Sequence, residues 1–362
     1  MGLLEKLPPP PNGKTGWPWT VETDEGERGS RTYPRITIIT PSFNQGEFIE
    51  ETIRSVLLQN YPDLEYIIID GASTDPTPEM IRKYEPWISY WISEPDSGQS
   101  SAINKGLVRV SGEIVNWINS DDLYEPGALF SVARFFMDHP DLDICAGKET
   151  VFENDHPDRT IPKEGTTVCP SVVDTILTAH IDQPPTFWRT SAFLANGPVN
   201  EEYHYLMDSE FWVRYLLANG QKKVGKCGQF LTRFRLHGDS KTVKANPRFE
   251  LERKILELSL AEICGTPGCV TEYMKEEAGI DRVIPILIRK ENCSPLAKPG
   301  RVAAHFSYIN YGHFYFNHEF DKCRIALRHY LARGHVIINL NLLKTLIGVF
   351  LLPQHLLKKI LS

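Results

Sequence analysis

The 362-residue sequence lacks any apolar run long enough to cross a membrane. Its longest uninterrupted apolar stretch extends from Leu346 to Leu352 and ends at Pro353, whereas a spanning helix needs about 20 such residues. The seven cysteines are scattered and odd in number, which is untypical of a disulfide framework or a zinc site. Reduced thiols favour a cytoplasmic protein, which can at most lie on the inner face of a membrane.

Two glycine-rich phosphate-binding motifs are also absent. The sequence has no G-x-x-x-x-G-K-[ST], and no G-x-G-x-x-G follows its first expected strand. The loop at that point is Pro41-Ser42-Phe43-Asn44-Gln45, which offers backbone groups and an aromatic ring instead. These absences argue against a P-loop nucleotide hydrolase and against a nicotinamide-dependent dehydrogenase.

The sequence also lacks a large excess of positive charge. It has 39 basic and 46 acidic residues, a net charge of −7, which argues against a nucleic acid as the main partner. The amino-terminal residues contain too short an apolar stretch for a signal peptide. Lys6 stands where a myristoylation motif requires Ser or Thr, so we expect neither modification nor secretion at this end.

What the composition does provide is material for a substantial core. With 41% hydrophobic and 23% charged residues, the chain is not disordered, collagen-like or a coiled coil. Residues 1–34, with four consecutive prolines, are expected to be an extended or disordered leader. We expect a main domain over 35–245 and a helical carboxyl-terminal region over 246–362.

The main domain alternates between two periodicities of apolar residues. Expected strands lie at 35–40, 66–69, 87–92, 114–118 and 143–152, and expected helices at 46–57, 77–84, 100–108 and 126–137. This alternation predicts an α/β fold with a mostly parallel, Rossmann-like sheet flanked by helices. Ligands of such sheets bind beyond the carboxyl ends of the strands. Polar residues gather there in four loops: 40–44, 70–75, 94–99 and 119–122.

Carboxylates in these loops suggest metal and nucleotide chemistry. Asp121 and Asp122 follow a buried strand, and adjacent carboxylates there can bind Mg or Mn, which in turn can neutralise a diphosphate. The alternative is that Asp122 caps the next turn and Asp121 is solvated. Asp70 ends the second strand and could accept a proton from a pyrimidine base. The alternative for Asp70 is an Asx-turn.

Taken together, the four loops resemble those of family-two inverting glycosyltransferases of the GT-A fold, notably bacterial enzymes that build surface polysaccharides. The resemblance rests on Thr40-Pro41-Ser42-Phe43-Asn44, Asp70 to Asp75, Glu94 to Gln99 with Ala102, Asn104, Lys105 and Gly106, and Asn119-Ser120-Asp121-Asp122, and extends to about Thr242. It implies nucleotide-sugar binding at Thr40, Pro41, Phe43, Asp70, Asp96, Asn104 and Asp121. It also implies a metal at Asp121 and Asp122, without deciding which of them touches it. Two departures, Gly71 and Asn119, occupy positions where many members have aspartate.

The resemblance continues into the second half of the domain. Asp208 aligns with the family's catalytic base, and a carboxylate is what the removal of a proton from an acceptor hydroxyl requires. His237 stands where relatives often place a histidine near the metal. Gln183 and Trp188 lie in a segment that lines the acceptor side in relatives. The structural alternatives are a helix N-cap for Asp208, a structural role for His237 and a core position for Trp188.

The resemblance implies transfer of a sugar, with inversion, from a nucleotide-diphosphate donor to a glycan or a lipid-linked acceptor. A UDP-sugar is favoured, with thymidine or guanosine donors as alternatives. The lysine-bearing apolar tail, 340–361, either contacts a membrane surface or packs on the helical region. Two other functions stay open: a sugar-nucleotide nucleotidyltransferase, and a catalytically silent carbohydrate-binding protein.

Overall fold

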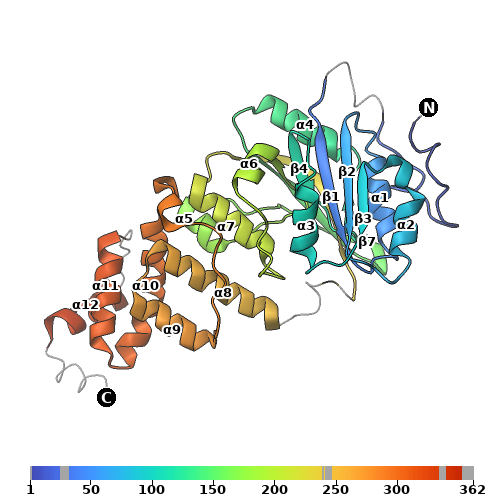
Figure 1. The fold of residues 1–362 in the computed structure, drawn as a ribbon. Coiled ribbons are helices and arrows are strands. Elements are labelled where there is room, and N and C mark those ends of the chain that lie inside the picture. Colours follow the sequence, from blue (N-terminus) through green and yellow to red (C-terminus); the bar gives the residue numbers. More distant parts are fainter. Residues whose placement is uncertain (1, 25–31, 239, 241–246, 334–339, 353–362) are drawn as a thin grey trace. The chain divides into compact units, whose positions relative to one another are not determined.

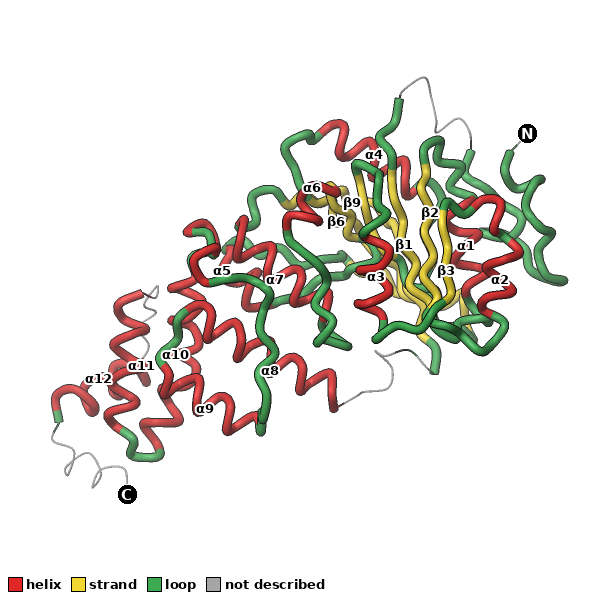
Figure 2. Tube along the Cα trace, viewed as in Figure 1, coloured by secondary structure: helices red, strands yellow, loops and turns green. Residues whose placement is uncertain are grey.

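The computed structural model describes residues 2–24, 32–238, 240, 247–333 and 340–352. The chain forms two compact units (Figures 1 and 2). Unit 1 comprises Met1–Thr167, His180–Trp212 and Lys222–Asn246, and unit 2 comprises Val168–Ala179, Val213–Gln221 and Pro247–Ser362. The candidate site lies in unit 1.

A single mixed sheet forms the centre of unit 1, and its described strands follow the order β3-β2-β1-β4-β8-β6-β9-β5, with β7 beside β6. The strands are β1 (Ile36–Ser42), β2 (Leu64–Asp70), β3 (Tyr90–Ser93), β4 (Ile114–Trp117), β5 (Leu123–Tyr124), β6 (Ile144–Glu153), β7 (His156–Lys163), β8 (Thr186–Arg189) and β9 (Val224–Leu236). The predicted parallel arrangement holds for β3-β2-β1-β4. Beyond β4 the sheet is mixed, because β8 runs antiparallel to both β4 and β6.

Helices cover both faces of the parallel half (Figure 2). The helices that begin in unit 1 are α1 (Ile49–Leu57), α2 (Thr77–Lys83), α3 (Gln99–Leu107), α4 (Ala128–Asp138), α6 (Thr190–Ala195) and α7 (Met207–Asn219). Ile38 belongs to the same buried cluster as Ile53 of α1. Its neighbour Ile39 points to the opposite face, where it lies so close to Gly106 of α3 that a Cβ there would be 2.7 Å from the Ile39 side chain. The expected strand at 87–92 begins later, because Glu85–Trp87 forms a 3₁₀ turn.

The pairing of β6 with β9 is parallel and irregular. Ile144 pairs with Val224, whereas Glu149 pairs with Thr232, so three extra residues enter β9 between these two points. Gly228 lies in the irregular stretch with a φ of 70°, a left-handed conformation that glycine adopts without strain. After the irregularity, β9 continues to Leu236 and leads directly to His237.

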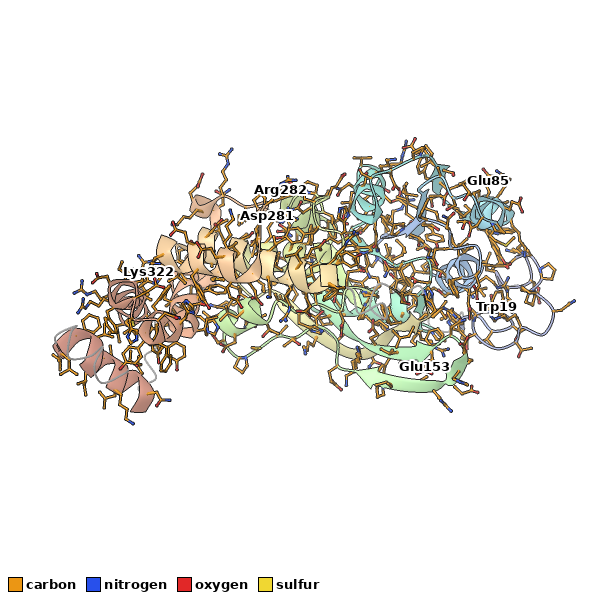
Figure 3. The ribbon with its side chains drawn as sticks, turned by 90° about the horizontal axis from the view of Figure 1, so that it is seen from below. Trp19, Glu85, Glu153, Asp281, Arg282 and Lys322 are labelled. Atoms are coloured by element: carbon orange, nitrogen blue, oxygen red, sulfur yellow. The ribbon has the colours of Figure 1, made fainter. Side chains whose placement is uncertain are left out.

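The amino-terminal leader is packed on unit 1 over its described residues, so the disordered alternative is wrong there. Arg54 of α1 has no exposed surface, and its guanidinium donates to the carbonyl oxygens of Pro8, Pro18 and Trp19 at 2.9, 3.0 and 2.7 Å. The guanidinium also lies over the Trp19 ring, which Figure 3 labels. One buried cation therefore anchors three leader carbonyls.

Unit 2 is helical, as predicted. It contains α5 (Val172–Thr178), α8 (Pro247–Cys264), α9 (Gly268–Ala278), α10 (Pro299–Phe316), α11 (Phe320–Arg333), α12 (Leu340–Leu346) and a π-helical turn at Ile347–Leu351. The expected helical hairpin at 302–332 is present as α10 and α11. Leu342 and Val349 are fully buried against this hairpin, so the tail packs on the protein through residue 352. Residues 353–361 of the predicted membrane-contacting tail lie outside the described residues. Within the described part of the chain, no helix is long and apolar enough to span a membrane.

Candidate active site

The carboxyl ends of the parallel strands bring the predicted loops to one edge of the sheet. Hydrogen bonds continue the ladder past the strand ends: Gly71 N donates to Ser42 O at 2.8 Å, and Ile118 N donates to Ile39 O at 2.9 Å. Glu94 N likewise donates to Asp70 O at 3.0 Å. The loops after β1, β2, β3 and β4 therefore start side by side, as the sequence predicts.

The two adjacent aspartates after β4 have different surroundings. Asp122 is 1% exposed, and its carboxylate accepts hydrogen bonds from Arg235 N and Asn119 Nδ2, both at 3.0 Å. Burial, followed by the charge of Asp121, raises the pKa of Asp122 well above its usual range. The Asp121 side chain keeps 21% of its surface exposed, and its Oδ2 lies 3.0 Å from His237 Nε2. Asp121 is thus the aspartate that is available to a ligand.

His237 is fixed on two sides. Its ring packs against that of Phe48, the residue before α1, with 4.4 Å between ring centroids. Its backbone N–H donates to Ser240 Oγ at 3.0 Å. His237 Nε2 also lies 3.0 Å from Asp121 Oδ2, in the loop where the resemblance implies a metal.

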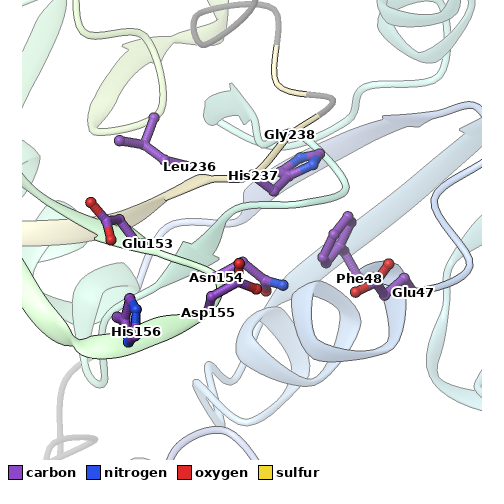
Figure 4. A pocket seen from close by; sticks show the side chains of 9 residues that line it. All are labelled: Glu47, Phe48, Glu153, Asn154, Asp155, His156, Leu236, His237 and Gly238. Carbon is purple, nitrogen blue, oxygen red and sulfur yellow. The ribbon is translucent and has the colours of Figure 1, made fainter.

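A cavity of about 530 Å³ opens beside Phe48 and His237 (Figure 4). Its walls come from the two residues before α1, from the turn between β6 and β7, and from the end of β9 with the residues that follow it. The lining residues are Glu47, Phe48, Glu153, Asn154, Asp155, His156, Leu236, His237 and Gly238. This cavity was not predicted, because its walls come from segments distant in sequence.

Asp70 is fully buried and its carboxylate is occupied by local hydrogen bonds. Ser73 donates to it through both its N–H, at 3.0 Å, and its hydroxyl, at 2.5 Å, and Ser93 Oγ donates at 2.5 Å. These bonds are not an Asx-turn, because the Ser73 N–H lies three residues after Asp70, whereas an Asx-turn closes on the N–H two residues on. Asp96 lies against Gly71, where a Cβ would be 2.9 Å from Asp96 Oδ2. A side chain at position 71 would therefore require the Asp96 carboxylate to shift.

Other predicted nucleotide-sugar residues differ in accessibility. The Thr40 hydroxyl lies in the interior, 3.1 Å from the Tyr66 hydroxyl, and Pro41 is also buried. Phe43 is 59% exposed at the edge of the sheet. Asn104 holds another loop: its side chain donates to Val199 O and Glu201 Oε1 and accepts from Val199 N, each at 2.9 Å.

The structure corrects the prediction for the acceptor side at Trp188. This ring has no exposed surface and packs edge-on against Phe193, Phe211 and Trp212, so the core alternative applies. Gln183 is 4% exposed, and its amide donates to Asn116 Oδ1 at 3.0 Å and Trp117 O at 2.7 Å. Gln183 therefore connects its loop to β4, and Trp188 lies within β8, between β4 and β6.

Asp208 lies in the first turn of α7 and is half-buried, with Oδ1 accepting from Ser209 N at 2.7 Å. The preceding residue, Met207, accepts a hydrogen bond from Ser100 Oγ of α3 through its sulfur. At the start of α3, Gln99 Nε2 donates to Asn119 Oδ1 at 2.7 Å. Two hydrogen bonds therefore connect the start of α7, through α3, to the loop that carries Asp121.

The donor set around Asp121 fits a cation that arrives with a diphosphate. In the described part of the chain, no group of three or more His, Cys, Asp or Glu side chains could hold a metal ion. Asp121 and His237 nevertheless place a carboxylate and an imidazole next to each other, with 3.0 Å between Oδ2 and Nε2. Mg sites at nucleotides commonly use one or two protein carboxylates and complete their coordination with phosphate and water oxygens. A two-residue set is sufficient for that chemistry.

Known proteins that are similar in sequence to this chain are named as glycosyltransferases. Residues 37–194 match the family model described as Glycosyl transferase family 2. A putative teichuronic acid biosynthesis glycosyltransferase, TuaG of Bacillus subtilis, is 38% identical over 108 residues, which are 29% of this chain and 43% of TuaG. An uncharacterized glycosyltransferase of Rickettsia typhi, RT0329, is 27% identical over 191 residues, 51% of this chain and 59% of the relative.

The match therefore spans less than two thirds of the length of these curated relatives. Among solved structures, S. aureus TarS 1–349 in complex with UDP-GlcNAc superposes with a TM-score of 0.53 at 16% identity, covering 84% of this chain and 94% of that chain. The complex of the same protein with UDP has a TM-score of 0.50 at 18% identity, covering 87% of this chain and 78% of that chain. At such identities the likeness shows the fold.

Proposed function

We propose that this protein transfers a sugar from a nucleotide-diphosphate donor to a hydroxyl group of a glycan or lipid-linked acceptor, with inversion at the anomeric carbon. The observation that carries the proposal is the contact between Asp121 and His237 at the carboxyl edge of the parallel strands. The edge position is where a nucleotide binds in such sheets, and the two side chains are suited to a cation that accompanies its diphosphate.

The roles of the chain's own residues follow from their places. Asp121 and His237 would hold Mn or Mg, which when bound neutralises the charge of the departing nucleotide diphosphate. Asp208 would accept the proton of the acceptor hydroxyl as that oxygen attacks the anomeric carbon from the face opposite the diphosphate. A single displacement of this kind inverts the configuration. Phe43, exposed beside the buried Asp70 loop, would lie against the nucleotide.

A UDP-sugar is the donor that we favour. S. aureus TarS 1–349 has been solved in complex with UDP and with UDP-GlcNAc, and this chain shares that fold. The name of the B. subtilis relative refers to teichuronic acid biosynthesis, which supports a glycan product at the cell surface. We place the reaction in the cytoplasm, at or near the inner face of the membrane.

The test is a panel of UDP-, dTDP- and GDP-sugars measured with and without Mn²⁺. We expect one donor to raise the thermal unfolding midpoint only when Mn²⁺ is present, and to be hydrolysed slowly to its nucleoside diphosphate. The Asp121→Asn variant is the control and should lose both effects. If no nucleotide-sugar changes the unfolding midpoint of the wild-type protein, the proposal is wrong.

A further inference from the structure

Arg235, near the end of β9, has more partners around the Asp121–Asp122 pair than any predicted site residue. Its side chain is 5% exposed. Nε donates to the carbonyl oxygen of Asp121 at 2.9 Å, and the backbone N–H donates to Asp122 Oδ1 at 3.0 Å. One residue therefore holds both aspartates, Asp121 through its backbone and Asp122 through its carboxylate.

The remaining guanidinium donors reach two other elements. One terminal nitrogen donates to Glu51 Oε2 of α1 at 2.9 Å, and the other donates to Asn154 Oδ1 in the turn between β6 and β7 at 2.8 Å. The guanidinium also lies over two aromatic rings, with 5.1 Å to the centroid of Phe48 and 4.7 Å to that of Phe152. Phe48 is the ring that packs against His237.

These contacts need the geometry of a guanidinium. Arginine presents donors in a planar fork and can stack on aromatic rings at the same time, whereas lysine carries one compact ammonium group. Because the fork is buried, its three acceptors fix its orientation, and the orientation fixes the Asp121 carbonyl. The arrangement therefore restrains the backbone of the residue whose side chain contacts His237.

The neighbouring arginine on the same face of β9 provides a contrast. Arg233 also lies over Phe152, with 4.9 Å to the ring centroid, but its side chain is 23% exposed. Its ion pair with Glu125 is long, at 4.0 Å, and Glu125 lies outside the 119–122 loop. Arg233 shares the strand and the aromatic contact with Arg235, but its ion pair is with Glu125.

We propose that Arg235 is a positioning residue for the cation site: it fixes the backbone of Asp121 so that the carboxylate stays beside His237, the pair that would hold the cation. This inference rests on the proposed function, because it assigns Asp121 and His237 to the cation. Replacing a residue that hydrogen-bonds to a metal ligand typically changes metal affinity 10- to 100-fold.

The experiment measures Mn²⁺ binding without turnover, by electron paramagnetic resonance of free Mn²⁺ in the presence of UDP. Arg235→Lys should weaken Mn²⁺ binding by about 10- to 100-fold. Arg233→Lys, the matched control, should bind Mn²⁺ as the wild type does. In assays with the sugar donor, the Arg235→Lys variant should need a higher Mn²⁺ concentration to reach its half-maximal rate. At saturating Mn²⁺ its kcat should recover much of the wild-type value.

Glu51→Gln is the second variant, because it weakens the same restraint without removing the arginine. It should shift Mn²⁺ affinity in the same direction by a smaller factor. A folded Arg235→Lys protein with wild-type affinity would overturn the inference, and so would an unfolded Arg235→Lys together with wild-type affinity in Glu51→Gln. If wild-type protein with UDP binds no Mn²⁺, the proposed function fails and the inference fails with it.

Discussion

His237 Nε2 lies 3.0 Å from Asp121 Oδ2, although 116 positions separate the two residues in the sequence. Asp122, directly after Asp121, points inward and is enclosed by Arg235 N–H and Asn119. The two aspartates therefore have separable tasks, and substitution by asparagine should separate them.

Asp121→Asn should abolish the effect of Mn²⁺ and lower turnover by at least about 100-fold, because the carboxylate charge that attracts the cation is lost. The unfolding midpoint without metal should stay close to that of the wild type, since Asp121 is partly exposed. Steady-state kinetics and thermal unfolding of the same preparation check both statements.

Asp122→Asn should instead act on stability. An amide places one NH₂ group where the carboxylate accepts two hydrogen bonds, so at least one buried donor loses its acceptor. We expect a loss of about 1–3 kcal/mol in the free energy of unfolding, measured by urea denaturation. Wild-type stability combined with lost Mn²⁺ binding would reverse the assignment of the two aspartates.

Asp208→Asn should lower kcat by about 10²- to 10⁴-fold, because an amide cannot accept the proton of the acceptor hydroxyl. Donor binding, measured by thermal shift with Mn²⁺, should remain. Glu202→Gln, at an exposed carboxylate on the loop before α7, is the control and should leave kcat unchanged. Unchanged turnover in Asp208→Asn would remove the assignment of the base.

Glu149 should make the protein less stable as pH rises. Burial, with the charge of Asp182 adding and that of Lys163 opposing, raises the pKa of Glu149 to about 8 from a usual value near 4.5. Between these values the folded chain keeps a proton that the unfolded chain has lost, so stability falls with increasing pH. The pKa of Asp122 is also raised, in part by the charge of Glu149, so Asp122 likewise makes stability fall as pH increases.

The corresponding variant is Glu149→Gln, which cannot ionise. Its unfolding free energy should change less than that of the wild type between about pH 5 and 8, and at pH 8 it should exceed the wild-type value. Urea denaturation at several pH values provides the comparison. A pH dependence equal to that of the wild type would contradict the raised pKa.

Arg54→Met should release the leader from α1. The substitution leaves three carbonyl acceptors without their donor and costs about 3 kcal/mol or more in the free energy of unfolding. Limited proteolysis should then cut within residues 8–20 faster than in the wild type. Arg82→Met, at an exposed arginine of α2, should leave both stability and cleavage nearly unchanged.

The parallel half of the sheet could be predicted because its strands are apolar runs that end in turn residues. Ile67, Ile68 and Ile69, for example, are all buried in β2. The later strands lack that pattern. Every residue of β7 is exposed and two of its eight are prolines, so no alternation of apolar residues marks it as a strand. β9 is also partly or fully exposed along most of its length, so it too lacks the alternation of apolar residues that marks a strand.

Part of the site could be predicted and part could not. The loops at the sheet edge follow from the order of strands, so the sequence predicts that Asp121 and Asp70, which follow or end parallel strands, lie at that edge. The different surroundings of Asp121 and Asp122 depend on Arg235, which lies 113 positions after Asp122. Trp188 gave no indication of its environment, because a tryptophan serves equally well in a core and in a sugar site.

The three extra residues between Val224 and Thr232 have a consequence for how this chain can tolerate insertions and deletions. Side chains alternate along a strand, so removing one residue near Gly228 would exchange inward and outward positions over the rest of β9. Leu236 would then occupy the place of Arg235, and an aliphatic group would face the acidic loop. Length at this point, rather than composition, sets the polarity of the whole edge.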